Sequence, residues 1–508
     1  MLSVPSVVKK LNMKPKRALI SVWDKTDIVE FAKELAALNI EILATGKTAK
    51  TLKDAGIKVI EVSDWTKSPE VLSGRVKTLH PKIAAGILSY RKESDIEPID
   101  IVICNLYPFE SYIKEQKPIE EIVELIDIGG VTLLRAAAKN YAYVSAVPKP
   151  EFYPIVLKDL KESGEVTPAT RELLALKTFE IIAHYDSVIN EYFYRHFEKV
   201  NFPEFYNKTF AKSLPLRYGE NPHQKAFFYN DPFSEIKINK LWGKELSYNN
   251  LLDIDSVISI INEFKDTVCA IMKHNTPCGV ALAKDPTDAF KQAFGADSKS
   301  AFGGIVGFNR EVRAAAAKSI IEIFFEVIVA PKISEEAMQV FRTRKNLRIV
   351  EFSGTMPKMM IRTALGGILI QERDLLAEDS SKWRVVSEKK PTSEQLKDLE
   401  FAWKVTKFVR SNGIVFAKDG KTVGIGAGQM SRVDSVELAI KKSEGGVKGS
   451  VMASDGFFPF RDSIDIAHNA GVTAIVEPGG SIKDEEVITA ANEHNLPLLF
   501  TQTRHFRH

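Results

Sequence analysis

Short apolar runs alternate with amphipathic segments in the first part of the chain. Four runs are apolar enough for buried strands, namely RALISVW, IEILAT, IKVIEV and IDIVICNLYPF. TDIVEFAKELAAL and KTAKTLKDAG instead space their apolar residues three and four positions apart, which predicts helices, and Gly56 favours a helix end. This alternation predicts a parallel α/β sheet with crossover helices.

The rest of the chain repeats this mixture after a break in the pattern. Strand candidates are VCAIMKH, GGIVGF, SNGIVFAK and TAIVEPG, and helical stretches separate them. NFPEFYNKTF, rich in aromatic residues, Pro and Asn, predicts a junction near residue 205. We therefore expect a leader at 1–16, one domain at 17–205 and a second at 206–508, whose roughly 300 residues favour two subdomains over one core.

Charge and cysteine usage exclude several classes of protein. The 508 residues carry a formal net charge of only +3, and the cations are mixed with acids rather than gathered into a basic stripe, so we expect no nucleic-acid partner. No apolar run approaches the roughly 20 residues of a membrane helix. The three cysteines, Cys104, Cys269 and Cys278, form no C-x-x-C motif and suit a reducing cytoplasm.

A candidate phosphate site follows the second predicted strand. ATGKTAK resembles a nucleotide-triphosphate loop, but that loop requires Gly at position 41, where this chain has Glu. A strand-to-helix turn remains, in which Thr45, Gly46 and Thr48 could bind one phosphate at a helix N-terminus, helped by Lys25 from the neighbouring strand end. A plain helix cap explains these residues equally well.

Polar groups also accumulate in the motifs SGRVKTLHP, NLYPF and IDIGGVTLLRAAAKN. Taken one by one, they favour an exposed basic loop, a packed tyrosine and an ordinary helix. Together they offer one carboxylate, one phenol and several cations near strand ends, which could hold a phosphorylated substrate and stabilise an oxyanion. The candidate residues are Arg75, Lys77, Tyr107, Asp127 and Lys139.

KHNTPCG raises the question of a metal. A zinc deaminase needs H-x-E and P-C-x-x-C, but Thr276 and Ala281 stand where Glu and the second Cys are required, so we expect no catalytic metal. A lone His at a strand end is usually structural, yet Lys273 beside His274 favours a neutral imidazole that can accept a proton. Arg, Asp and Phe in SDGFFPFRDSID and TRHFRH suit a flat anionic heterocycle.

Ten motifs occur in the order seen in a known bifunctional family. They are RVKTLHP, NLYPF, IDIGGVTLLRAAAKN, LRYGENPHQ, KHNTPCGVA, SAFGGIVGFNR, GIGAGQMSR, SDGFFPFRDSID, PGGSIKDEEVI and RHFRH. The chain resembles the family that combines AICAR transformylase with IMP cyclohydrolase. The resemblance implies a methylglyoxal-synthase-like N-terminal domain and a transformylase of two cytidine-deaminase-like halves without the deaminase metal.

The resemblance also implies the chemistry. AICAR is formylated by 10-formyltetrahydrofolate to FAICAR, which closes to IMP, in a cytoplasmic homodimer whose transformylase site lies at the interface. Lys273 and His274 match one catalytic pair, and Lys77, Tyr107, Asp127 and Lys139 match the cyclohydrolase site. Lys25, Thr45, Gly46, Thr48 and Arg75 match phosphate or substrate contacts. The nucleotide or folate contacts match Arg217, Tyr218, Asn250, Phe302, Gly303, Glu326, Asn412, Arg432, Phe457, Asp462, Arg504 and Phe506.

Two positions depart from the family pattern. Lys47 stands where the phosphate turn usually has a second Gly, and Trp23 replaces a small residue. One alternative is a deaminase-like nucleotide enzyme, which a zinc assay would reveal. The other is a phosphometabolite-binding regulatory protein, which would bind its ligand without turnover.

Overall fold

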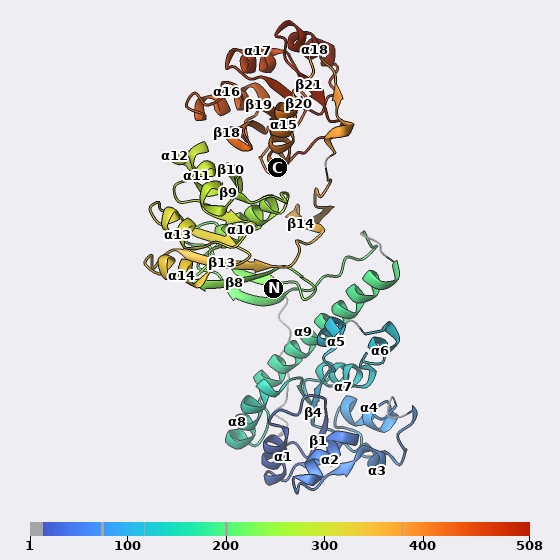
Figure 1. Ribbon diagram of the computed structural model, residues 1–508. Helices are drawn as coiled ribbons and strands as arrows, with labels where there is room; N and C mark the ends of the chain where they lie inside the picture. Colours follow the sequence, from blue (N-terminus) through green and yellow to red (C-terminus); the bar gives the residue numbers. More distant parts are fainter. Residues whose placement is uncertain (1–13, 73–75, 116, 199–201, 378) are drawn as a thin grey trace. The chain divides into compact units, whose positions relative to one another are not determined.

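The computed structural model describes residues 14–72, 76–115, 117–198, 202–377 and 379–508. The chain divides into two compact units, Met1–Phe210 and Ala211–His508, compared with an expected junction at residue 205. Figure 1 shows the helices and strands of both units. Within the described ranges, no helix combines the length and apolarity that crossing a membrane requires.

The N-terminal unit is built on a five-stranded parallel sheet in the order β3-β2-β1-β4-β5. Its strands are β1 (Arg17–Val22), β2 (Glu41–Ala44), β3 (Ile60–Glu61), β4 (Ile101–Asn105) and β5 (Ser145–Val147). Its helices are α1 (Ile28–Ala37), α2 (Gly46–Asp54), α3 (Val62–Thr66), α4 (Pro81–Leu88), α5 (Phe109–Tyr112), α6 (Ile119–Val123), α7 (Ile128–Lys139), α8 (Tyr153–Ser163) and α9 (Pro168–Phe193). The predicted parallel α/β sheet is confirmed.

Side-chain alternation along the strands explains why helices cover both faces of this sheet. In β1, Ala18 and Ile20 pack with α1, α2 and α8, whereas Leu19 between them packs with α3, α4, α7 and α9. Successive residues of a strand point to opposite faces of the sheet, so one apolar strand contributes side chains to the cores on both faces. The carboxyl ends of the parallel strands then meet at one edge of the sheet, where the loops carry the candidate residues.

The C-terminal unit contains a twelve-stranded sheet in the order β16-β21-β20-β19-β17-β18-β10-β9-β11-β12-β13-β8. The strands of its first half are β8 (Lys237–Trp242), β9 (Val268–Lys273), β10 (Thr276–Leu282), β11 (Ile305–Phe308), β12 (Val327–Ala330) and β13 (Arg348–Ser353). Those of its second half are β16 (Arg384–Val385), β17 (Ile414–Lys418), β18 (Lys421–Gly426), β19 (Val451–Ser454), β20 (Ala474–Glu477) and β21 (Leu498–Phe500).

The helices of the C-terminal unit also divide between the two halves. The first half has α10 (Tyr248–Ile261), α11 (Pro286–Ala296), α12 (Ser298–Ala301), α13 (Ala314–Ile320) and α14 (Glu335–Phe341). The second half has α15 (Ser393–Thr406), α16 (Arg432–Lys442), α17 (Asp462–Asn469) and α18 (Asp484–Glu493). One continuous core lies under α10 and α15, and separate cores lie under the helices of the opposite face.

The two halves have the same strand order counted outward from their junction. That junction is the antiparallel pair β10 and β18, where Ala281 faces Lys421. Outward from β10 the order is β9, β11, β12, β13 and β8, and outward from β18 it is β17, β19, β20, β21 and β16. The predicted two-part C-terminal domain is thereby confirmed as two copies of one α/β arrangement that share a sheet.

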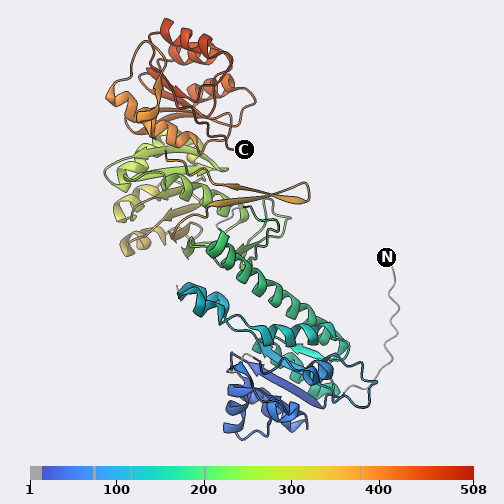
Figure 2. The same ribbon diagram turned by 90° about the vertical axis from the view of Figure 1, so that its right-hand side faces the viewer.

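Two short ribbons stand apart from this sheet. One pairs β6 (Ala211–Pro215) with β7 (Phe227–Asn230), and the other pairs β14 (Met359–Ala364) with β15 (Gly367–Glu372). Figure 2 shows the second ribbon, in gold, extending from the body of the C-terminal unit. Its tip residue Leu365 is fully exposed and Leu369 is mostly exposed, so apolar side chains cover part of this arm.

Candidate active sites

The predicted phosphate residues meet where β1 and β2 end. Thr45 is the N-cap residue of α2, and its hydroxyl lies 3.0 Å from that of Ser21. The Thr48 hydroxyl donates to the carbonyl of Val22 at 3.1 Å, and Lys25 Nζ donates to the same carbonyl at 3.2 Å. Residues from two neighbouring strands therefore fix the start of α2, where unpaired backbone N–H groups favour an anion.

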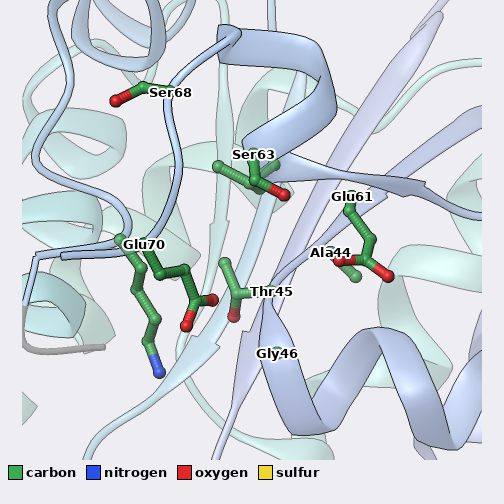
Figure 3. A pocket seen from close by; sticks show the side chains of 9 residues that line it. Ala44, Thr45, Gly46, Glu61, Ser63, Ser68 and Glu70 are labelled. Atoms are coloured by element: carbon green, nitrogen blue, oxygen red, sulfur yellow. The ribbon is translucent and has the colours of Figure 1, made fainter. Parts of the chain in front are cut away.

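Positive charge gathers around this helix start. Burial lowers the pKa of Lys25, and the nearby charges of Lys47 and Lys77 lower it further. Lys77 lines a pocket together with Thr45, Gly46 and Glu70. In Figure 3, the side chains of Thr45 and Glu70 point toward one another near the first residue of α2. A Cβ on Gly46 would lie 3.5 Å from Glu70 Oε1, so this carboxylate occupies the side of the pocket next to the helix start.

A second group of predicted residues lies around the N-terminus of α7. Asp127 is its N-cap, and its Oδ1 accepts a hydrogen bond from the N–H of Gly130 at 2.7 Å. Burial raises the pKa of Asp127, while Gly130 and the charge of Lys77 oppose that rise. Burial also raises the pKa of Tyr107, and the charge of Asp127 raises it further. Lys77 therefore lies close enough to Asp127 to affect the pKa of its carboxyl group, and Asp127 lies close enough to Tyr107 to affect the pKa of its hydroxyl.

Aromatic packing and a buried hydroxyl support this cluster. The ring of Tyr107 meets the ring of Trp23 edge to face, with 5.1 Å between centroids. The backbone N–H of Asp127 donates to the Tyr185 hydroxyl of α9 at 2.8 Å. Trp23, which departs from the family pattern, thus packs against a candidate catalytic side chain.

Two further predicted cyclohydrolase residues are Arg75 and Lys139. Arg75 lies outside the described residues. Lys139 is the last residue of α7, whereas Asp127 precedes the first. A helix rises about 1.5 Å per residue, which separates the two backbones by about 18 Å along the axis. This distance exceeds the length of a lysine side chain, so Lys139 does not reach the Asp127 cluster of its own chain.

In the C-terminal unit, Lys273 and His274 lie on the tight turn between β9 and β10. His274 and Asn275 have positive φ angles of 53° and 60°. The N–H of Asn275 donates to Asp253 of α10 at 2.6 Å, and Lys273 Nζ donates to the carbonyl of Phe302 at 2.8 Å. Burial raises the pKa of Asp253, although the Asn275 hydrogen bond and the charge of His274 oppose that rise. The turn thus carries an imidazole and an ammonium group on consecutive residues.

A network of polar side chains lies near this turn. Glu326 accepts hydrogen bonds from Asn250 Nδ2 at 3.1 Å and from Arg348 Nη1 at 3.2 Å. Arg217 Nη2 donates to the Tyr218 hydroxyl at 2.8 Å. Burial lowers the pKa of Arg348, the charge of Glu326 opposes this, and the charge of Arg217 adds to it. These charges connect the predicted Arg217, Tyr218, Asn250 and Glu326 into one group. Sequence reasoning missed Asp253 and Arg348.

The remaining predicted residues of the first half shape the rim of this group. Gly303 has a φ of 75°, and its N–H donates to the carbonyl of Phe324 at 2.8 Å. The exposed ring of Phe302 lies 5.3 Å from the ring of Phe324. The left-handed conformation of Gly303 explains the choice of glycine and leaves Phe302 free to contact a ligand.

A second polar cluster forms in the other half, around Arg432. This buried guanidinium donates to Asn412 Oδ1 at 2.9 Å, to Ser454 Oγ at 2.8 Å and to the carboxylate of Asp455. Phe506 packs on Gly456, because a Cβ at that glycine would lie 2.6 Å from its ring. Sequence reasoning missed Asp455, although the motif SDGFFPF contains it.

Three more predicted residues lie at the edge of the Arg432 cluster. The guanidinium carbon of Arg504 lies 4.6 Å from the centroid of the Phe506 ring. Phe457 is 41% exposed, as is Phe506. Asp462 is the first residue of α17 and accepts a hydrogen bond from the N–H of Ser463 at 2.6 Å. Aromatic faces and cations thus line this edge, as a flat anionic ligand requires.

The C-terminal segment links the two clusters of this unit. Arg507 Nη2 donates to Ser256 Oγ at 2.8 Å, and Ser256 donates to Asn275 Oδ1 at 3.0 Å. The carbonyl of Arg507 accepts a hydrogen bond from the N–H of Ser411, the neighbour of Asn412. A series of hydrogen bonds therefore connects the Arg432 cluster with the His274 turn. In the part of the chain that the structure describes, no group of three His, Cys, Asp or Glu side chains could hold a metal ion.

Comparison with known proteins identifies the family. Residues 137–442 match the family of the AICARFT/IMPCHase bienzyme, and residues 27–132 match the MGS-like domain. A bifunctional purine biosynthesis protein PurH from Persephonella marina is 49% identical and one from Caldicellulosiruptor saccharolyticus is 47% identical, over 97% of this chain and 100% of each relative. A PurH from Anoxybacillus flavithermus is 46% identical with the same coverage.

A solved structure titled "Crystal structure of ForH" is 34% identical over 35% of this chain and 99% of its own, with a TM-score of 0.30 that supports no argument about the fold. The family matches and the full-length relatives show that the chain belongs to the bifunctional AICAR transformylase/IMP cyclohydrolase family, which catalyses the last two steps of purine biosynthesis, AICAR formylation and IMP cyclisation.

Proposed function

We propose that the C-terminal unit transfers the formyl group of 10-formyltetrahydrofolate to AICAR and that the N-terminal unit closes the product, FAICAR, to IMP. The family is folate-dependent, and the observation that carries the assignment is the β9–β10 turn. Asp253 holds its backbone, and Lys273 and His274 extend from it beside the Glu326 network. An acceptor and a donor on one rigid turn suit formyl transfer, which moves a proton while an oxyanion forms.

In the transfer step, the AICAR amine attacks the formyl carbon of the folate. The amine is a weak nucleophile because the ring and its carboxamide withdraw its lone pair, so loss of its proton to His274 accelerates the attack. Lys273 stabilises the oxyanion of the tetrahedral intermediate. Collapse of that intermediate breaks the bond from the formyl carbon to the folate nitrogen, and the proton held by His274 passes to that nitrogen. No step requires a metal.

In the closure step, the carboxamide nitrogen of FAICAR attacks the formyl carbon, and water leaves after proton transfers. Lys77 stabilises the oxyanion, and Asp127 and Tyr107 manage the protons. Lys139 of the same chain lies at the far end of α7 and takes no part in this cluster. The pKa of Asp127 is raised by burial, so it lies closer to neutral pH than the pKa of an exposed aspartate. A pKa nearer to neutral pH suits a group that both accepts and donates a proton.

The nucleotide phosphate binds at the start of α2, held by Lys25, Thr45, Gly46, Thr48 and Arg75. The gathering of Lys25, Lys47 and Lys77 supports this site, because like charges repel one another unless an anion binds between them. The phosphate displaces the Glu70 carboxylate from the pocket, since two anions cannot share it.

The transformylase site is completed by a second copy of the chain in a cytoplasmic homodimer. The substrate contacts fall into two clusters, one in each half of the unit, with Arg217, Tyr218, Asn250, Phe302, Gly303 and Glu326 in the first and Asn412, Arg432, Phe457, Asp462, Arg504 and Phe506 in the second. The exposed leucines of the β14–β15 ribbon support burial against another chain.

The test follows both products separately. We measure tetrahydrofolate release and IMP formation from AICAR and 10-formyltetrahydrofolate in the wild type, His274→Ala and Lys77→Ala. We expect His274→Ala to lose release by about 100-fold or more, and Lys77→Ala to release tetrahydrofolate normally while losing enzymatic closure. If both variants lose both activities together, the assignment of one activity to each unit is wrong. Binding of AICAR without turnover in the wild type would support the regulatory alternative.

A further inference from the structure

The chain ends in an extended segment that follows β21. Arg504 and Phe506, two of the proposed substrate contacts, are exposed, whereas His505 between them is only 2% exposed. Successive side chains of an extended chain point to opposite sides, so one side of this segment faces solvent and the other faces the core. The orientation of Arg504 and Phe506 therefore depends on how His505 is held.

A carboxylate from a distant part of the chain holds His505. The imidazole Nδ1 forms a hydrogen bond with Oδ2 of Asp374, which follows the end of β15. The centroid of the imidazole ring lies 5.0 Å from that of Trp403, a fully buried residue of α15. The backbone N–H of His505 donates to the carbonyl of Asp455 at 3.1 Å. Three separate parts of the fold thus fix the side chain and backbone of His505.

A second contact joins the β14–β15 ribbon to the end of the chain. Arg362 of β14 donates from Nη2 to the carbonyl of His508 at 2.8 Å. The base of the ribbon is itself anchored, because Arg373, the neighbour of Asp374, donates to Asp255 of α10 at 2.9 Å. The ribbon therefore holds the C-terminal segment at two points, and α10 fixes the base of the ribbon.

The hydrogen bond between Asp374 and His505 is charge-assisted. Burial by itself raises the pKa of Asp374, but the hydrogen bond and the charge of His505 lower it below its ordinary value. An ionised carboxylate only accepts hydrogen bonds, so Nδ1 is the donor. Such a bond fixes the orientation of the imidazole ring. Because the Asp374 side chain is 47% exposed, we expect its loss to affect this orientation more than the stability of the core.

We propose that Asp374 and His505 are positioning residues for formyl transfer, which keep Arg504 and Phe506 in the orientation that binds substrate. His505 is too deeply buried to contact a ligand itself, and Asp374 acts on the site through His505. The inference rests on the proposed transformylase function and extends it, because it assigns to the base of the ribbon a part in substrate binding.

Steady-state kinetics of formyl transfer in Asp374→Ala test the proposal. Arg504→Ala is measured beside it to show which substrate Arg504 contacts, through a rise in the KM for AICAR or for 10-formyltetrahydrofolate. We expect Asp374→Ala to raise the KM for that same substrate by about fivefold and to leave kcat within about twofold of the wild type. A rise in KM at constant kcat marks the loss of binding interactions rather than of the chemical step.

Asp379→Ala is the matched control. Asp379 follows Asp374 on the same connection between β15 and β16, and its side chain is 49% exposed, close to the 47% of Asp374. It accepts a hydrogen bond from the N–H of Ser381 within its own turn. We expect this variant to keep the kcat and both KM values of the wild type.

Variants of His505 show whether the hydrogen bond or only the packing matters. His505→Asn places an amide N–H near the position of Nδ1, so we expect its KM values to stay within about twofold of the wild type. His505→Leu has no donor, and we expect the same rise in KM as in Asp374→Ala. Because both substitutions remove one interaction, the double variant Asp374→Ala with His505→Leu should raise KM no further than the larger single effect. If His505→Leu does not fold, Asp374→Ala and Asp379→Ala still decide the question.

The outcomes separate this inference from the proposed function. If Asp374→Ala leaves both KM values unchanged, or if Asp379→Ala raises KM as much, the pair does not position the segment and the inference is wrong. Single effects that add fully in the double variant also overturn it. If Arg504→Ala changes neither KM, Arg504 is not a substrate contact and the inference falls, while transfer by Lys273 and His274 stands. If the wild type shows no formyl transfer, the proposed function itself is wrong.

Discussion

The two halves of the C-terminal unit make the same hairpin turn from different residues. In the first half, His274 and Asn275 occupy the turn between β9 and β10, and in the second, Asp419 and Gly420 occupy the turn between β17 and β18. All four residues have positive φ angles, between 53° and 69°. Asp-Gly is a favoured pair for this conformation, whereas a bulky His is unfavourable.

Both turns are held by an aspartate at the same place in the preceding helix. Asp253 is the sixth residue of α10 and Asp398 is the sixth of α15. Asp253 accepts a hydrogen bond from the N–H of Asn275, and Asp398 accepts hydrogen bonds from both N–H groups of its turn at 2.9 Å. The frame is therefore common to both halves, and only the first half places an imidazole on it. The second half serves as a control within the same molecule.

The largest expected effect comes from giving the first turn the sequence of the second. His274→Asp with Asn275→Gly keeps a favourable turn but replaces the imidazole with a carboxylate, which is a much weaker base near neutral pH and has a shorter side chain. We therefore expect tetrahydrofolate release to fall by about 100-fold or more. The reciprocal change, Asp419→His with Gly420→Asn, leaves release within about twofold of the wild type and lowers the free energy of unfolding by about 1–2 kcal/mol. Release that survives the first exchange removes His274 from the mechanism.

A smaller effect is expected from the paired aspartates. Asp253→Asn loosens the turn beside His274, and we expect formyl transfer to fall by about tenfold. Asp398→Asn leaves transfer unchanged but lowers the free energy of unfolding by about 1–2 kcal/mol, because an amide oxygen replaces only one of two carboxylate acceptors. Steady-state kinetics and urea unfolding of both variants check this, and equal losses of transfer would show that the halves are not functionally distinct.

The smallest effect concerns the end of a central strand in each half. β12 ends at Ala330 and β20 ends at Glu477, both fully buried, and burial raises the pKa of Glu477 to about 8. Between its ordinary value of 4.5 and about 8, the folded protein keeps a proton that the unfolded chain releases, so rising pH lowers the free energy of unfolding. Glu477→Gln has no such proton.

We therefore expect the melting temperature of Glu477→Gln, relative to the wild type, to rise by a few degrees between pH 5 and pH 8. Calorimetry of both proteins over this range measures the gap. A gap that does not change with pH means that Glu477 is already ionised in the folded protein.

Local sequence patterns were sufficient to predict the fold. They predicted a functional site only where the reactive residues lie within one short motif. Strand and helix alternation predicted the parallel sheet, and KHNTPCG singled out Lys273 and His274. Asp253 and Arg348 were missed because their partners are distant along the chain and only folding brings them together. Lys139 shows the converse, since its motif also contains Asp127 but the rise of α7 separates the two.

Asp127 combines two roles that tolerate different replacements. As the N-cap of α7, it could be exchanged for Ser, Thr or Asn, each of which accepts a hydrogen bond from the backbone of the first turn. As a proton carrier, it could be exchanged only for another carboxylic acid, and Glu is a poor cap. Selection for the two roles together leaves a single acceptable amino acid, so this position should resist drift even when its neighbours change freely.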